Sequence, residues 1–170
     1  KDRTVGIIGT GAIGYRTANL AKAFGAKVIG YNRSHSHDDI TYTDLNTLLQ
    51  TSDIVSIHLP LTKDTKHFID KDKLSLMKKD AILINTARGG IIDNEALAAA
   101  LKKGEIAGAG IDVFDMEPPL PEDYPLLSAP HTVLTPHVGF DTEEAMERRA
   151  AIVADNLKSF VEGKQKNIIC

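Results

Sequence analysis

Val5-Gly6-Ile7-Ile8-Gly9-Thr10-Gly11-Ala12-Ile13-Gly14 is a short apolar run that leads directly into a set of spaced glycines. The apolar run predicts a buried strand, and the glycines predict a tight turn into a helix. Gly9 permits the turn, Gly11 lets the backbone come close to a pyrophosphate, and Gly14 lets the helix pack against the strand. The helix that follows directs its N-terminal amides, and the positive end of its dipole, at the phosphates.

The surroundings of this turn favour a dinucleotide site over a glycine turn that binds nothing. A helix is predicted over Ala12–Phe24, and a second strand is predicted over Lys27–Tyr31. Strand, turn, helix and second strand form a βαβ unit, which is the context in which a G-x-G-x-x-G pattern binds a dinucleotide. A glycine turn without a ligand is the alternative.

Length and composition suit one globular domain. The chain has 170 residues, of which 42% are hydrophobic and 25% charged, and its net charge is -3. Because there is no basic stripe and no apolar run of membrane-spanning length, we expect neither nucleic acid nor membrane as a partner. The single cysteine, Cys170, provides no disulfide framework and fits a reducing cytoplasm. Since Lys1 lies so close to the first predicted strand, we expect residues 1–170 to be one domain excised from a longer enzyme.

Strand and helix signals alternate along the chain, which predicts an α/β fold of the Rossmann type with a doubly wound parallel sheet. The predicted strands are Thr4–Ile8, Lys27–Tyr31, Ile54–His58, Ala81–Asn85, Ala107–Val113 and Thr132–Thr135. The predicted helices are Ala12–Phe24, Asp44–Thr51, Lys71–Lys78, Asn94–Lys103 and Thr142–Glu162. The proline-rich segment Glu117–Pro130 is expected to be a long loop.

Polar residues close the predicted strands at the edge where such folds bind ligands. Arg88 follows one strand end, and its guanidinium can hold a carboxylate through two parallel hydrogen bonds. His137 follows another and can act as acid or base near neutral pH. Glu117 can accept a hydrogen bond from an imidazole and favour its protonated form. Each has a simpler reading as an ordinary loop residue, but their joint placement at strand ends favours carbonyl chemistry.

Four blocks of the sequence resemble the signature blocks of the D-2-hydroxyacid dehydrogenase family, which is specific for the D isomer. They are His58-Leu59-Pro60-Leu61-Thr62 with Thr65, Asn85–Asp93, Gly110–Pro118 and Thr135–Gly139. The resemblance covers essentially the whole chain. It implies that the chain is a nucleotide-binding domain, and that the substrate domain formed by both ends of the full enzyme is absent.

The resemblance also implies roles for individual residues. Arg88 would bind the carboxylate and keto oxygen of a 2-keto acid, His137 would donate a proton during reduction, and Glu117 would orient and charge His137. Cofactor contacts are implied for Ala12 and Ile13 at the pyrophosphate, for Leu59 and Pro60 at the adenosine, for Thr86, Ala87 and Asp112 at the nicotinamide, and for the block residues His58, Thr65 and Gly139. No metal is required.

Asn32 departs from the family pattern, because many members carry Asp at this position to bind the adenosine ribose. A neutral side chain removes the repulsion of a 2′-phosphate, and Arg33 with Ser34 offers a cation and a hydroxyl beside it. NAD and NADP are both possible cofactors, and this pattern favours NADP. The alternative is that Asn32 binds the ribose as Asp would, while Arg33 points into solvent.

Other interpretations stay open at this stage. His35 and His37 invite a metal site, but their spacing is poor and a solvated loop is the simpler reading. A nucleotide sensor similar to C-terminal-binding-protein corepressors and the NAD domain of an adenosylhomocysteine hydrolase are the alternative functions. Glyoxylate, hydroxypyruvate, pyruvate and 3-phosphoglycerate are all possible substrates. The resemblance implies a homodimer, for which the sequence offers apolar contact candidates in Leu120, Tyr124, Leu126 and Leu127.

Overall fold

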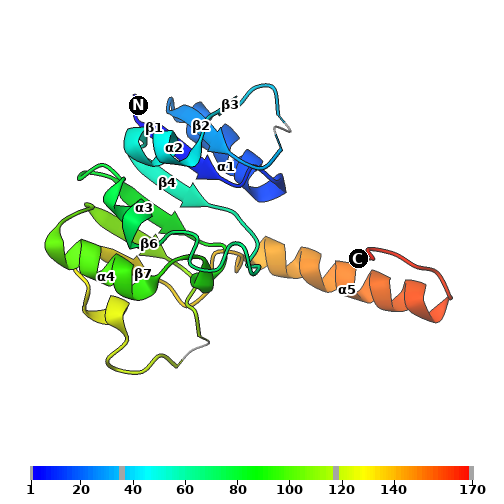
Figure 1. Ribbon diagram of the computed structural model, residues 1–170. Coiled ribbons are helices and arrows are strands. Elements are labelled where there is room, and N and C mark those ends of the chain that lie inside the picture. The colour runs from blue at the N-terminus through cyan, green and yellow to red at the C-terminus, as the bar shows by residue number, and fades with distance from the viewer. Residues whose placement is uncertain (1, 35–36, 117–118, 169–170) are drawn as a thin grey trace. The chain divides into compact units, whose positions relative to one another are not determined.

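A computed structural model describes residues 2–34, 37–116 and 119–168 of the chain. It divides into two compact units, of which the first ends at His137 and the second begins at Val138. The first unit contains the glycine loop and all strands of the sheet (Figure 1).

The first unit is built on a seven-stranded, fully parallel sheet with the strand order β3-β2-β1-β4-β5-β6-β7. The strands are β1 Thr4–Ile8, β2 Lys27–Tyr31, β3 Thr41–Tyr42, β4 Ile54–Ile57, β5 Ile82–Asn85, β6 Gly108–Ile111 and β7 Thr132–Leu134. All six predicted strands are confirmed to within two residues at either end. The sequence analysis missed β3, because two residues carry no detectable apolar pattern. The predicted doubly wound fold is confirmed, since the strand order reverses between β1 and β4.

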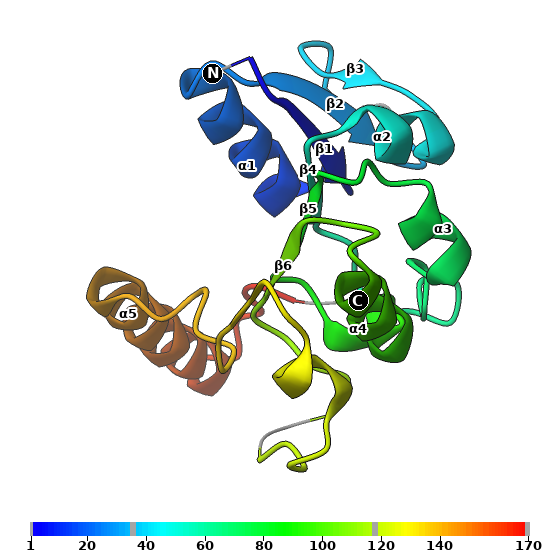
Figure 2. The same ribbon diagram turned by 90° about the vertical axis from the view of Figure 1, so that its left-hand side faces the viewer.

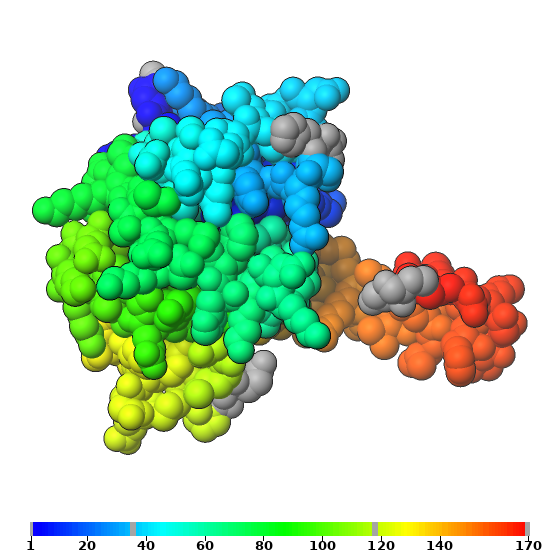
Figure 3. Space-filling model, viewed as in Figure 1, coloured from blue at the N-terminus to red at the C-terminus, as the bar shows by residue number. Residues whose placement is uncertain are grey.

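Helices cover the sheet, with α1 on one face and α2, α3 and α4 on the other (Figure 2). Their bounds are α1 Ala12–Ala23, α2 Leu45–Thr51, α3 Lys71–Ser75 and α4 Asn94–Lys103. Cyan and green atoms, the colours of the region that includes α2, α3 and α4, make up much of the surface in the space-filling view (Figure 3). Asp44, Asp70 and Asp93 begin α2, α3 and α4, because each carboxylate accepts a hydrogen bond from a backbone amide of the first turn.

The larger part of the core lies between the sheet and the helices of the second face, and a smaller cluster, which includes Val5, Ile7 and Ala18, lies between the sheet and α1. The fully buried members of the larger part include Ile8, Ile57 and Leu83 on the central strands. At the opposite edge from the strand ends, Asp53 accepts a hydrogen bond from the Thr4 amide at 2.7 Å and forms an ion pair with Lys78. These contacts join the start of β1 to the start of β4 and thereby fix the register of the central strands.

The proline-rich segment is not wholly a loop, because Pro125–Ser128 forms the 3₁₀-helix η2. Tyr124, which precedes this helix, and Leu126 within it are buried in the core, and the Tyr124 hydroxyl donates a hydrogen bond to Asp115 at 2.6 Å. The prediction that these two residues are dimer contacts is therefore wrong. The sequence pattern was misleading because apolar residues between prolines can face inward as readily as outward. Leu127 is exposed.

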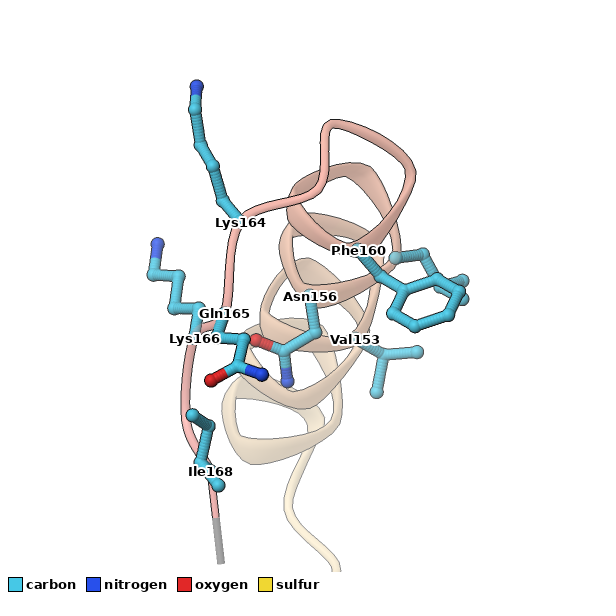
Figure 4. A pocket seen from close by; sticks show the side chains of 8 residues that line it. Val153, Asn156, Phe160, Lys164, Gln165, Lys166 and Ile168 are labelled. Carbon is cyan, nitrogen blue, oxygen red and sulfur yellow. The ribbon is translucent and has the colours of Figure 1, made fainter.

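The second unit consists of α5, Glu143–Val161, and the segment that follows it. Thr142 caps the helix through its hydroxyl, and Gly163, at φ +71°, ends it, as the sequence predicted. Residues 164–168 run back along the helix and enclose with it an apolar hollow of about 420 Å³ beside Val153, Phe160 and Ile168 (Figure 4). No residue predicted to bind a ligand lines this hollow. Of the helices described, none has the length and apolar character needed to cross a membrane.

Candidate functional site

The glycine loop after β1 has the tight geometry that its sequence predicts. Gly9 has φ +92°, and a Cβ added there would lie 2.7 Å from the carbonyl oxygen of His58. A Cβ on Gly14 would lie 1.9 Å from the carbonyl oxygen of Gly9. These two glycines are therefore required by the protein itself, because a side chain at Gly9 would clash with the backbone after β4 and one at Gly14 would push α1 away from the turn.

Gly11 differs from both, because nothing lies within 4 Å of a Cβ added to it and its φ of -67° suits any residue. It is the N-cap of α1, and no side chain caps this helix or places a negative charge in its first turn. The other α-helices of the described residues are all capped by an Asp or Thr side chain. The amides of Gly11, Ala12 and Ile13 thus form an open, positively polarised surface that fits a pyrophosphate. Ile13 is 72% exposed beside them.

A first hollow of about 600 Å³ lies beyond the ends of β2 and β4. It brings together five residues predicted to bind the cofactor, which are Asn32, Arg33, Leu59, Pro60 and Thr65. Tyr31, Asp64 and Phe68 complete its lining, and none of these three was foreseen because each carries an ordinary core or surface pattern. Its apolar walls and single arginine suit an adenosine with a phosphate attached.

Two of the predicted residues here are also used within the protein. The Thr65 hydroxyl donates to the carbonyl of Pro60 at 2.6 Å and accepts from the amide of Thr62 at 2.7 Å, so it fixes the loop after β4. The Asn32 amide donates to the carbonyl of Ser34 at 3.0 Å, which shapes the turn after β2. Ser34 is exposed and does not line the hollow.

A second hollow of about 480 Å³ lies at the turns after β1, β4 and β5 and shares Leu59 and Pro60 with the first. It is lined by Ile13, His58, Leu59, Pro60, Leu61, Thr86, Ala87 and Arg88. It lies at the reversal of strand order, which is where doubly wound sheets bind their ligands. Nε2 of His58 lies 2.9 Å from the Ser56 hydroxyl, and burial lowers the pKa of His58. His58 therefore lines this hollow with an uncharged imidazole at pH 7.

A third hollow of about 740 Å³ continues from the second through Leu61 and Arg88. Lys63, Lys66 and His67 line it together with Arg88, so most of its charged groups are cations. The sequence analysis did not foresee these three residues, although Lys63 and Lys66 flank the matched Thr65. The arrangement favours an anionic ligand.

The turn that carries Arg88 is held by Asn85, whose side chain is fully buried at the end of β5. Its Nδ2 donates to the carbonyl of Arg88 at 3.0 Å, and its Oδ1 accepts from the amide of Ala87 at 3.0 Å. The Arg88 guanidinium donates to the carbonyl of Ala87 at 2.6 Å and is otherwise exposed. Asn85 thus positions a guanidinium that remains accessible to a carboxylate.

The remaining predicted residues lie at the ends of β6 and β7. Asp112 is buried and accepts a hydrogen bond from the Thr135 hydroxyl, which links the two strand ends. His137 is exposed and has φ +59°, a left-handed conformation that is uncommon outside glycine and that concentrates at functional sites. Neither residue lines the three hollows described above. Glu117 lies outside the described residues, and Gly139 belongs to the second unit.

Only one member of the histidine pair considered as a metal site, His37, lies within the described residues. His35 lies outside the described residues, and His37 contacts the glycine loop and α1. Within residues 2–34, 37–116 and 119–168, no three His, Cys, Asp or Glu side chains are grouped to hold a metal ion.

Comparison with known proteins places these features in a family. Residues 1–139 match the family described as D-isomer specific 2-hydroxyacid dehydrogenase, NAD binding domain. The glyoxylate reductase of Thermofilum pendens is 46% identical over 170 aligned residues, which cover 96% of this chain and 50% of that protein. This chain thus spans about half the length of that curated relative.

Solved structures agree with this match. The NAD-complexed D-isomer specific 2-hydroxyacid dehydrogenase of Lactobacillus delbrueckii ssp. bulgaricus superposes with a TM-score of 0.88 at 39% identity, covering 97% of this chain and 55% of that one. An acyclic imino acid reductase in complex with NADPH and D-Arg gives a TM-score of 0.90 at 38% identity. The match covers 100% of this chain and 54% of that one. The predicted family is confirmed: this chain belongs to the NAD-binding domains of the D-isomer specific 2-hydroxyacid dehydrogenases.

Proposed function

We propose that this chain binds a nicotinamide dinucleotide along its three connected hollows and serves an enzyme that interconverts 2-keto acids and D-2-hydroxy acids. One observation carries the proposal. The three hollows share lining residues in sequence, so they lead from Asn32 and Arg33, past Ile13 in the first turn of α1, to the exposed side chain of Arg88. The bound nicotinamide supplies or accepts the hydride, and the protein supplies placement and charge.

The residues of the path suit the parts of the cofactor in order. The first hollow takes the adenosine between the walls formed by Leu59 and Phe68. The uncapped start of α1 takes the pyrophosphate, because its amides have no side-chain acceptor. The second hollow takes the nicotinamide beside Thr86 and Ala87.

Arg88 and His137 have separate tasks in the proposed reaction. Arg88 holds the substrate carboxylate through two parallel hydrogen bonds, and Lys63 and Lys66 strengthen the positive field around it. His137 donates a proton from its ring to the keto oxygen during reduction and takes it back in the reverse direction. Glu117 orients the imidazole and favours its charged form. Asp112 contacts the nicotinamide side of the cofactor.

We propose further that NADP is accepted and preferred over NAD. Asn32 is neutral and does not repel a 2′-phosphate, and its side-chain amide is held by the carbonyl of Ser34. The Arg33 side chain is exposed and lines the first hollow, where it can reach such a phosphate. The competing possibility, that Asn32 serves the ribose hydroxyls, predicts the opposite preference.

The rest of the proposal concerns the whole protein. We propose that the full-length protein is a cytoplasmic homodimer that acts on small 2-keto acids such as glyoxylate or hydroxypyruvate. The matches over residues 1–139 do not favour a corepressor-like sensor or an adenosylhomocysteine hydrolase. A full-length protein that bound NADH and a peptide but reduced no 2-keto acid would instead support the sensor.

Titration calorimetry and turnover assays test the proposal together. The 170-residue chain should bind NADH or NADPH but show almost no turnover, because no second domain closes over the site to exclude water. The full-length enzyme should reduce at least one member of a 2-keto acid panel. Absence of binding at millimolar dinucleotide refutes the proposed cofactor site, and robust turnover by the chain alone refutes the proposed need for a second domain.

A further inference from the structure

The segment that follows the turn after β2 is fastened to the glycine loop by a histidine. The ring of His37 lies flat on the ring of Tyr15 in α1, with centroids 3.7 Å apart and planes 6° apart. Its Nε2 lies 3.1 Å from the carbonyl oxygen of Thr10. Because a carbonyl oxygen can only accept, Nε2 carries the proton and donates it in this contact.

Further contacts hold the same segment in place. Thr10 is fully buried, and its hydroxyl lies 2.9 Å from the hydroxyl of Tyr42 in β3. Near the end of α1, Lys22 donates to the carboxylate of Asp39 at 2.8 Å and also to its backbone carbonyl. The segment from His37 to Tyr42 is thus attached to α1 and to the glycine loop at several points.

This attachment closes a short bridge, which is the stretch of chain between Tyr31 and His37. The bridge carries Asn32 and Arg33, which line the first hollow, the proposed adenosine site. At its beginning, the amide of Gly9 donates to the carbonyl of Tyr31 at 2.8 Å. At its far end, His37 donates to Thr10, the next residue of the same glycine loop. Arg33 follows the first of these points by two residues and precedes the second by four, so both fixed points lie close to it along the sequence.

We infer that His37 is a positioning residue for the 2′-phosphate of the cofactor. It acts through the bridge, because fixing the far end against Thr10 holds Arg33 at the first hollow. The inference rests on the proposed function, in which Arg33 meets a 2′-phosphate. Histidine suits the position because it both stacks on Tyr15 and donates to a carbonyl. Phenylalanine retains only the stacking, and glutamine retains only the donor.

Two nucleotides that differ only in the phosphate at this corner provide the test. Binding of 2′,5′-ADP and of 5′-AMP to the chain is measured by calorimetry for the wild type and for His37→Ala, His37→Phe and His37→Gln. His131→Gln is the control, because His131 is an exposed histidine that precedes β7. Thermal unfolding of every variant shows whether the fold is intact, and the two conservative variants remain informative if His37→Ala unfolds.

The inference predicts that His37→Ala weakens 2′,5′-ADP about tenfold and 5′-AMP less than twofold, which corresponds to a loss of roughly 1.4 kcal/mol for the first nucleotide alone. His37→Phe and His37→Gln should each retain part of the preference, and His131→Gln should retain all of it. Equal weakening of both nucleotides, or no change, overturns the inference while leaving the proposed cofactor site intact. A wild type that does not distinguish the two nucleotides contradicts the proposed preference for NADP and this inference together.

Discussion

Gly11 and Gly14 lie in one turn, but the structure assigns them different reasons for being glycine. A Cβ on Gly14 would lie 1.9 Å from the carbonyl oxygen of Gly9, whereas a Cβ on Gly11 would meet nothing within 4 Å. No contact in the protein and no backbone strain explains Gly11, since its φ is -67°. Under the proposed function, we therefore expect Gly11 to leave room for the pyrophosphate of the cofactor.

The two alanine substitutions should therefore separate stability from binding. Gly14→Ala forces α1 off the turn, at a cost of about 2–3 kcal/mol, which is typical of a methyl group placed where there is no space. For a chain of this length, that cost lowers Tm by roughly 4–12 °C. Gly11→Ala should change Tm by less than about 2 °C, because a slightly poorer N-cap is offset by lower entropy of the unfolded chain.

Although Gly11→Ala should barely change stability, it should weaken the binding of NADH. The added methyl group lies where the pyrophosphate approaches, so Gly11→Ala should weaken NADH at least tenfold, or by about 1.4 kcal/mol. Thermal unfolding by circular dichroism and calorimetric titration with NADH measure the two effects on the same samples. If Gly11→Ala binds NADH as tightly as the wild type, the pyrophosphate does not lie over this turn and the reasoning fails.

Further predictions concern the substrate, the cofactor, the fold and the assembly. Arg88→Lys in the full-length enzyme should lower kcat/KM roughly a hundredfold, or about 2–3 kcal/mol, because an ammonium cannot reproduce the planar fork; near-normal kcat/KM would remove Arg88 from substrate binding. Arg33→Ala should weaken NADPH about tenfold and leave NADH unchanged, whereas Asn32→Asp should shift preference toward NADH; a wild type that binds NADH a hundredfold tighter than NADPH refutes this. Lys78 and the Thr4 amide hold the pKa of Asp53 below its ordinary value, so Asp53 stabilises the fold above about pH 4 and loses this effect as pH falls. Asp53→Asn should accordingly cost about 1–2 kcal/mol at pH 7 in urea unfolding, and an unchanged difference at pH 2 would contradict that account. Light scattering at tens of micromolar should give the mass of a dimer, and a monomer mass would contradict the proposed assembly.

Much of the fold could be read from the sequence because parallel strands buried on both faces are continuous apolar runs. The turn after β1 could also be predicted from the sequence, since Gly9 and Gly14 have geometric roles that no other residue can fill. Local patterns did not show whether side chains of the proline-rich segment face the core or the surface. Tyr124 and Leu126 were expected on the surface and lie in the core. That outcome depends on how the proline-rich segment packs against α4, which no short window encodes.

The candidate site was predictable in its strand-end residues and not in the residues that support them. Arg88 could be found because it follows an apolar strand. The two hydrogen bonds that hold its turn, one donated and one accepted by the Asn85 side chain, could not. His37 was considered only as a metal ligand or, more simply, as a solvated loop residue, because its contacts with Thr10 and Tyr15 join positions far apart in the sequence. Such long-range contacts require the folded backbone.

The most direct test of the central claim is a nuclear magnetic resonance titration of the chain with NADH and NADPH, followed through backbone amide shifts. Binding along the strand-end edge predicts the largest shifts at Gly11, Ile13, Arg33, Leu59 and Thr86. The shift at Arg33 should be larger with NADPH than with NADH. Largest shifts at Val153, Leu157 and Phe160, which line the hollow on α5, or no shifts at millimolar nucleotide, would contradict the claim that the dinucleotide binds at this edge of the sheet.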